Sequence, residues 1–381
     1  MDHSGHGMTM DLPPFTLGRG LEFSPDLFFL VGCVLGLALY GWGVARLRGR
    51  GDAWPVSRTV FFAAGVLTVA LMMCTKLNDY GMVMFSVHMV QHMVISMLSP
   101  ILLLLGAPVT LALRALPVAA RGGLVDQAGP ASGVWRRGSQ GGGGRQRGGG
   151  TSRARRATGE LATDDNAARR GARTREPGLI GKTPPRGSKG PREWLLMLLH
   201  SRYMRIITHP AFTIPLFIAS LYGFYFTPLF DTLMGSKVGH IAMMVHFLAV
   251  GLVFFWPIMG VDPGPHRPGY VMRMLELFAG MPFHAFFGIA LMMATEPMIK
   301  AYENPPASLG IDALTDQNAA GGIAWAFSEI PSVIVLIALV YQWYHSEQRQ
   351  AVRKDRAADR DGDKELEAYN AYLASLQTRG R

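Results

Sequence analysis

The chain alternates long, uncharged apolar runs with short polar connections, a pattern typical of proteins that cross a membrane several times. A helix needs about 20 apolar residues to cross the hydrocarbon core of a bilayer. Seven runs reach or approach that length, at residues 27–47, 59–77, 83–105, 211–227, 239–259, 271–295 and 322–341. The fourth run is the shortest and contains Pro215. We therefore predict an all-α integral membrane protein built as a bundle of seven transmembrane helices.

The distribution of basic residues predicts how this bundle is oriented. Lys and Arg gather after the first, third, fifth and seventh runs, at Arg46, Arg48, Arg50, Arg58, Arg114, Arg267, Arg273, Arg349, Arg353, Lys354 and Arg356. The N-terminal segment and the other connections are neutral or acidic. Because cytoplasmic loops carry an excess of Lys and Arg, we expect the N-terminus outside and the C-terminus in the cytoplasm. The predicted location is a bacterial plasma membrane.

The same pattern divides the chain into five segments. Residues 1–25 form a predicted extracytoplasmic leader that contains His and Met, residues 26–120 carry transmembrane helices 1–3, and residues 193–345 carry helices 4–7. Residues 121–192 form a predicted disordered cytoplasmic loop rich in Gly and Arg, and residues 346–381 form a charged cytoplasmic tail. An alternative origin for the monotony of residues 138–175 is DNA read out of frame.

The net charge of +10 belongs to that loop, which holds 16 Lys and Arg against 5 Asp and Glu. The loop is nearly free of aromatic side chains. It can therefore neither bury a core nor stack on bases, so we do not expect nucleic acid as a partner. The two cysteines, Cys33 and Cys74, both fall inside apolar runs, which excludes a disulfide framework.

Histidines lie inside several of the predicted spans. Ionisable groups within a membrane are costly to bury and are functional candidates for that reason. His88 and His92 belong to the third span, His246 to the fifth and His284 to the sixth, all in the predicted outer half. The spacing of His88 and His92 places both imidazoles on one face of their helix. We expect these four side chains to line one metal site.

Copper is the predicted metal. Imidazole suits copper, zinc, iron and nickel, whereas thioethers and thiolates favour copper(I), and the chain holds 22 methionines. Candidate accessory ligands or proton relays are Met243, Met281, Met292, Glu329, Cys74 and His240, and candidate metal collectors in the leader are His3, His6, Met8 and Met10. Each has a plainer alternative: methionine also fills gaps in a core, a membrane histidine also packs through hydrogen bonds, and Glu329 could pair with a histidine instead of a metal.

Several stretches of the chain resemble the bacterial CtaG family of caa3-type cytochrome c oxidase assembly factors. The stretches that carry the resemblance are HMVQH at 88–92, LGAPVTL at 105–111, SLYGFYFTP at 220–228, GVDPGP at 260–265, MPFHAFFG at 281–288, GGIAW at 321–325 and DRAADR at 355–360. The resemblance implies seven spans and a role in oxidase maturation through copper handling. It maps the family's membrane histidines onto His88, His92, His246 and His284. The connection between the third and fourth spans is much longer than the short basic loop of relatives.

These features together predict a non-enzymatic assembly factor that binds copper at the outer-leaflet site and delivers it to a cytochrome c oxidase. The predicted partners are oxidase subunits and the lipid bilayer. One alternative is a haem-binding membrane oxidoreductase that uses paired histidines as axial ligands. Another is a transporter of copper or protons. The sequence leaves open which oxidase copper centre is served, how many coppers bind, the role of Glu329 and the oligomeric state.

Overall fold

The computed structural model describes residues 12–117, 190–362 and 364–379. The predicted collectors of the leader (His3, His6, Met8 and Met10) and nearly all of the predicted Gly/Arg-rich loop lie outside these residues. Within the described ranges the protein is all-helical and contains no strand, only an isolated bridge between Phe23 and Thr75. The all-α part of the predicted fold is therefore confirmed.

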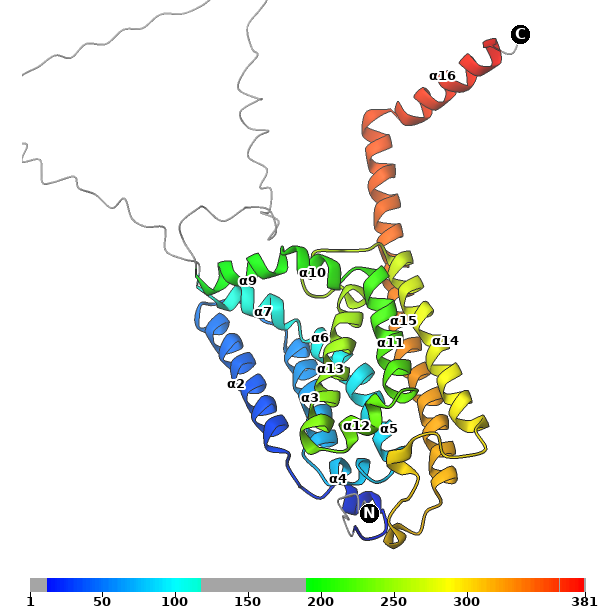
Figure 1. Ribbon diagram of the computed structural model, residues 1–381. Coiled ribbons are helices and arrows are strands. Elements are labelled where there is room, and N and C mark those ends of the chain that lie inside the picture. The colour runs from blue at the N-terminus through cyan, green and yellow to red at the C-terminus, as the bar shows by residue number, and fades with distance from the viewer. Residues whose placement is uncertain (1–11, 118–189, 363, 380–381) are drawn as a thin grey trace, which may run out of the picture.

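Most of the described residues lie in long helices that run side by side (Figure 1). They are α2 (Leu27–Gly49), α3 (Val56–Met73), α11 (Pro210–Tyr225), α13 (Lys237–Met259), α14 (Tyr270–Met293) and α15 (Ala313–Asp361). One further rod joins α5 (Phe85–Met93), a π-helix (Val94–Leu98) and α6 (Ser99–Leu105). The shorter elements are α1 (Leu17–Gly20), α4 (Leu77–Gly81), α7 (Pro108–Ala115), α9 (Pro191–Leu199), α10 (Arg202–Ile207), α12 (Leu229–Met234), α16 (Lys364–Arg379), η2 (Lys300–Tyr302) and η3 (Ala307–Leu309).

Six helices in the described ranges are long and apolar enough to cross a membrane. The predicted fourth span forms α11, an apolar helix of only 16 residues that begins at a proline and contains Pro215. It packs in the bundle against α13 and α14. The protein is thus a multi-pass membrane protein, while the count of seven spans stays a prediction because α11 is shorter than a full crossing.

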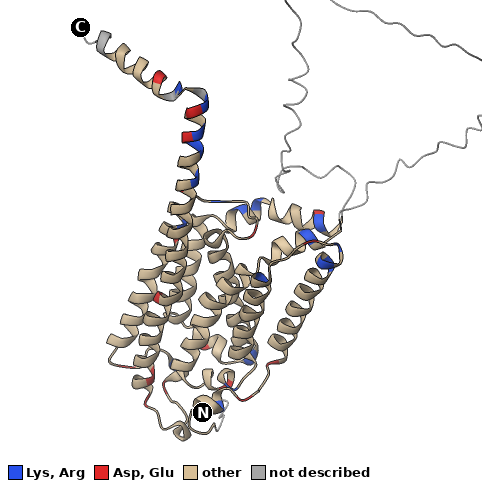
Figure 2. Ribbon diagram, turned by 180° about the vertical axis from the view of Figure 1, so that it is seen from behind, with Lys and Arg blue, Asp and Glu red and all other residues tan. Residues whose placement is uncertain are grey.

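The charged side chains are distributed unequally between the two ends of the bundle (Figure 2). Lys and Arg gather at the end where α7, α9 and α10 lie, and Asp and Glu are more frequent in the connections at the other end. We call these the arginine-rich end and the acidic end. The asymmetry is the one from which the orientation was predicted, and the orientation itself stays a prediction.

A close helix contact holds α14 against α15. A Cβ atom built on Gly288 would lie 2.5 Å from the carbonyl oxygen of Gly321, and one on Gly321 would lie 2.6 Å from that of Gly288. Only glycine lets the two backbones approach this closely, and small residues at helix crossings are typical of membrane bundles. This contact lies one turn of α14 beyond His284 and so fixes the position of that side chain.

At the arginine-rich end, α7 turns away from α6 at Ala107, whose φ of 51° is the only positive value at a non-glycine residue in the described part of the chain. Asp262, in the connection between α13 and α14, caps α7. Its carboxylate accepts hydrogen bonds from Thr110 N–H at 2.7 Å, Thr110 Oγ1 at 2.6 Å and Val109 N–H at 3.1 Å. Burial raises the pKa of Asp262, and these hydrogen bonds oppose the rise.

Candidate metal-binding site

Helix α5 carries His88 and His92 into the centre of the bundle, where they are 0% and 2% exposed. Its first turn is capped from α15, because the Asp316 carboxylate accepts hydrogen bonds from the N–H groups of Phe85 and Ser86. The π-helix begins directly after this segment, at Val94. Such local widening of a helix is frequent at functional sites. The two imidazoles lie on one face, one turn apart, as the spacing predicts.

The imidazole nearer the acidic end of the bundle, His88, faces His240 near the start of α13. The ring centroids lie 5.8 Å apart, and both side chains are buried. Tyr225 on α11 places its hydroxyl 3.1 Å from Nε2 of His88. The ring of Tyr302, in the connection between α14 and α15, lies 5.9 Å from that of His88, with an angle of 52° between the planes. The ring of Phe230 also packs edge-on to His88, with the ring centroids 5.2 Å apart. We call His88 and His240 the outer pair, because the acidic end is the one predicted to lie outside.

The deeper imidazole, His92, faces His284 on α14. Their ring centroids are 6.5 Å apart with an angle of 31° between the planes. Phe247 packs edge-on to His92 at 4.1 Å, and Phe217 lies 5.1 Å from His284. A small cavity of about 10 Å³ adjoins both histidines, with Ser220 in its wall. We call His92 and His284 the inner pair.

His246, the remaining predicted ligand, lies beside the inner pair without facing it. Its Nε2 is 2.9 Å from Oγ of Ser220, and its ring packs against Phe224 at 5.0 Å. The side chain is half-buried. Of the four predicted ligands, the structure therefore brings His92 and His284 together, gives His88 a different partner and holds His246 by a hydroxyl.

The imidazoles of the two pairs keep several ring nitrogens without a hydrogen-bond partner. These atoms are Nδ1 of His88, both nitrogens of His92 and Nε2 of His240, all buried. A buried polar atom without a partner costs roughly 1–3 kcal/mol, and such atoms are rare in folded proteins. These unpartnered nitrogens therefore lower the stability of the metal-free protein. A cation bound between the rings would give them a partner.

No group of three or more His, Cys, Asp or Glu side chains in the described ranges is arranged to hold a metal ion. The histidines form pairs instead of a single four-ligand cluster. Ring nitrogens of a pair at these centroid separations can approach one ion from two sides. Copper(I) accepts two donors, and imidazole is a suitable ligand for it.

The candidate accessory residues are scattered around the pairs. Met243 is buried one turn from His240, Met292 packs against Gly321, and Met281 is half-buried. Glu329 is half-buried on α15, and within the described residues no hydrogen bond or ion pair connects it to a histidine. Cys74 directly follows the last residue of α3 and has a free thiol. Their roles as ligands or relays stay predictions.

The sequence analysis named His240 only as an accessory candidate and did not name Tyr225, Tyr302 or Asp316 as neighbours of the histidines. A helical-face count offered a signal for His240, since it lies seven residues before the buried Phe247 and therefore shares its face. His246 is displaced from that face. The tyrosines come from α11 and from a connection, so no local pattern associates them with His88.

Comparison with known proteins finds one family whose model matches most of the chain. The model of a family described as cytochrome c oxidase caa3 assembly factor matches residues 38–136 and 173–346, which is most of the chain. The matched ranges include all four predicted ligands and leave out residues 137–172, within the predicted loop.

Uncharacterized proteins of mycobacteria are similar to this chain. Those of Mycobacterium bovis and Mycobacterium tuberculosis are each 40% identical over 374 residues, 97% of this chain and 47% of the relative. One of Mycobacterium leprae is 39% identical over 347 residues, 90% of this chain and 42% of the relative. The chain thus spans about half the length of these relatives. No solved structure matches it.

Proposed function

The chain belongs to the family of caa3-type cytochrome c oxidase assembly factors, and from this premise we propose that it binds copper(I) at its buried histidine pairs and delivers it to a cytochrome c oxidase. Copper is the cargo in this proposal, and the protein acts without catalysing a reaction. The family description supports the assembly role. The histidine pairs support the identity of the cargo.

The observation that carries the proposal is the set of unpartnered ring nitrogens on facing imidazoles inside a membrane bundle. His92 alone buries two such nitrogens, with His284 on the facing side. A packing role for these histidines would leave the desolvation of the nitrogens uncompensated. A soft cation between the rings supplies the missing partner, and it binds neutral imidazole well.

The size of the inner cavity favours an ion as the occupant. Its volume of about 10 Å³ is near the lower limit for holding one water molecule. An ion fits this space, whereas a porphyrin between the rings would require the aromatic side chains Phe217 and Phe247 to move. The packing around the inner pair thus argues against the haem-binding alternative.

The two pairs suggest a direction of movement. The outer pair lies beneath the connection that carries Tyr302, whose hydroxyl donates to the carbonyl of Gly81 at 2.7 Å. The inner pair lies one turn of α5 deeper, a rise of about 6 Å. In our proposal copper(I) enters at the outer pair, exchanges ligands to reach the inner pair, and leaves toward the oxidase by the same end.

The test is a titration of the purified, full-length protein with copper(I) against a coloured chelator of known affinity. We expect His92→Ala and His284→Ala to weaken binding by more than about 100-fold, since even the loss of an outer-shell partner costs roughly 10–100-fold in metal affinity. His345→Ala is the matched control. That histidine lies in the C-terminal half of α15, where its ring packs on Tyr341 at 4.3 Å.

The delivery step is tested in cells that lack the native gene and express each variant. We expect both inner-pair variants to lower oxidase activity and the copper content of the purified oxidase, and His345→Ala to leave them unchanged. Normal oxidase copper in all variants would rule out delivery. Uptake of copper into sealed vesicles containing the protein would point to the transporter alternative, and a Soret band in the purified protein would point to haem.

A further inference from the structure

The arginine-rich end of the bundle contains an apolar cavity far from the two histidine pairs. It has a volume of about 200 Å³ and lies between α7, α9 and the connection from α13 to α14. Its wall is formed by Leu113, Leu196, Leu199, Val261, Pro263 and Pro265. Three basic side chains stand around it, Arg114, His200 and Arg267.

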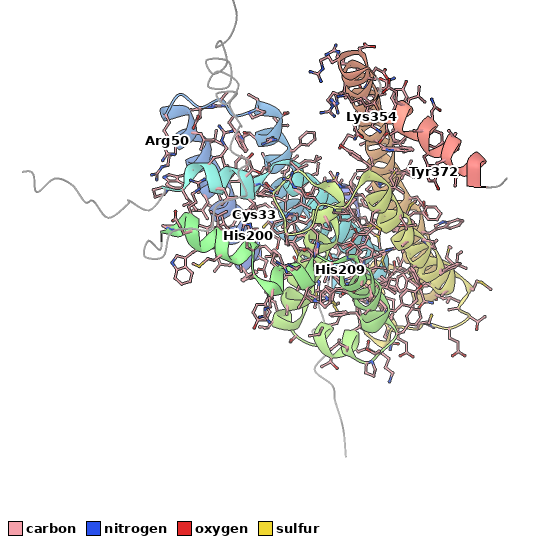
Figure 3. All side chains as sticks on the ribbon, turned by 90° about the horizontal axis from the view of Figure 1, so that it is seen from above. Cys33, Arg50, His200, His209, Lys354 and Tyr372 are labelled. Carbon is pink, nitrogen blue, oxygen red and sulfur yellow. The ribbon has the colours of Figure 1, made fainter. Side chains whose placement is uncertain are left out.

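A second hollow adjoins this cavity and adds to its positive charge. It shares Leu113 and Arg114 with the first and is also lined by Arg50, Arg192 and Asp52. Figure 3 views this end from above, with Arg50 and His200 labelled. Four arginines thus surround a single acidic side chain of the lining, which forms a half-exposed ion pair of 3.7 Å with Arg114. The lining carries an excess of positive charge.

Several donors of these arginines are unused within the described part of the chain. Nε of Arg192 is buried without a hydrogen-bond partner. The exposed Arg267 forms no hydrogen bond or ion pair with another described residue. Guanidinium groups bind phosphate oxygens in a planar, two-pronged geometry, so unused donors around one hollow favour a phosphate group there.

The cavity lies where lipid headgroups are expected. Helices α7 and α9 run across the ends of the spanning helices (Figure 1). On α9, Trp194 is 58% exposed, and Leu198 is exposed as well. An exposed tryptophan on a short apolar helix is typical of the membrane interface. The cavity is therefore lined in part by a helix of interfacial character, at the level where headgroups are expected.

We propose that this cavity binds one anionic phospholipid, with the phosphate held by Arg114 and Arg267 and part of an acyl chain against the leucines. Basic pockets between helices are a known way of recognising anionic headgroups. A free phosphate would leave the apolar wall unfilled, and a zwitterionic lipid would leave the excess positive charge unbalanced. The site is independent of copper, since it lies at the opposite end of the bundle from the outer pair.

The test uses the purified full-length protein in a neutral detergent, with native mass spectrometry and thermal unfolding as readouts. We expect one phosphatidylglycerol to be retained per chain and phosphatidylcholine to be retained much less. In the double variant Arg114→Gln/Arg267→Gln, the affinity for phosphatidylglycerol should fall about tenfold or more, because charge-assisted hydrogen bonds to phosphate are lost. Arg48→Gln, an exposed arginine at the same end, should change it little.

A second variant, Leu196→Trp, fills the cavity and keeps every arginine. This variant should also lose the bound lipid. It therefore tests the proposal even if the double variant folds poorly. Equal retention of both lipids, or an equal loss in Arg48→Gln, would show a diffuse charge effect and overturn the proposal. Stabilisation by inorganic phosphate as large as that by phosphatidylglycerol would show a simple anion site and overturn it too.

Discussion

Asp316, near the start of α15, accepts a hydrogen bond of 3.2 Å from the backbone N–H of Ser86 on α5, 230 residues away in the chain. The same carboxylate also accepts from Ser86 Oγ and from the N–H of Phe85. A carboxylate at a helix N-terminus satisfies free N–H groups and opposes the positive end of the helix dipole. Asp316 thereby ties the helix that carries His88 and His92 to the last long helix of the bundle.

Removal of this cap is expected to loosen the histidine site. Asp316→Ala should destabilise the protein by about 1–2 kcal/mol and weaken copper(I) binding, because α5 would lose the contact that sets its position. Thermal unfolding in detergent and a copper(I) titration measure the two effects. Asp312→Ala is the control, since Asp312 is an exposed cap of α15 itself. Equal effects in both variants would show that the cap has no special relation to the site.

The outer pair predicts a difference between two histidines of one helix. In our proposal each pair can hold one copper(I). His240→Ala should therefore lower the metal bound at saturation from two ions per chain to one, because His88 then has no facing imidazole. His246→Ala should leave two, since that ring is held by Ser220. Metal analysis of protein saturated with copper(I) gives both numbers. The reverse result, with His246 essential and His240 dispensable, would contradict the pairing.

The contact between α14 and α15 predicts a strong effect of adding one methyl group. Gly288→Ala should destabilise the protein by about 1–3 kcal/mol, the usual cost of overpacking, because the new Cβ would lie 2.5 Å from the carbonyl oxygen of Gly321. Gly223→Ala on α11 meets nothing within 4 Å and should be neutral or stabilising by up to about 1 kcal/mol. Equal melting temperatures for the two variants would show that the helices separate easily.

The cap of α7 predicts a loss of stability without a loss of copper. Asp262→Ala leaves Thr110 and Val109 without their hydrogen-bond acceptor and should lower the free energy of unfolding by about 1–3 kcal/mol. The substitution lies at the arginine-rich end, away from the histidine pairs. Copper(I) affinity should stay at the wild-type value. Asp52→Ala, which removes a half-exposed ion pair with Arg114, should cost only about 0–1 kcal/mol. A weaker copper affinity in Asp262→Ala would reveal coupling between the two ends.

Hydropathy predicted the elements well and their connections poorly. A membrane-spanning helix is a local property, since its length and apolar content are both present in one continuous run. The predicted runs accordingly coincide with long helices, apart from the shorter α11. The π-helix after His92 and the interfacial helices α9 and α10 leave no comparable trace, because they depend on neighbouring helices and on position at the end of the bundle.

By itself, the sequence determined that this is an all-helical membrane protein, with histidines inside its spans and basic residues gathered in alternate connections. The tertiary structure alone decided which histidines face each other. The rotation of each helix about its axis follows from contacts such as Gly288 with Gly321 and Asp316 with Ser86, between residues far apart in the chain. For this reason His240 and not His246 faces His88, and one expected cluster became two pairs.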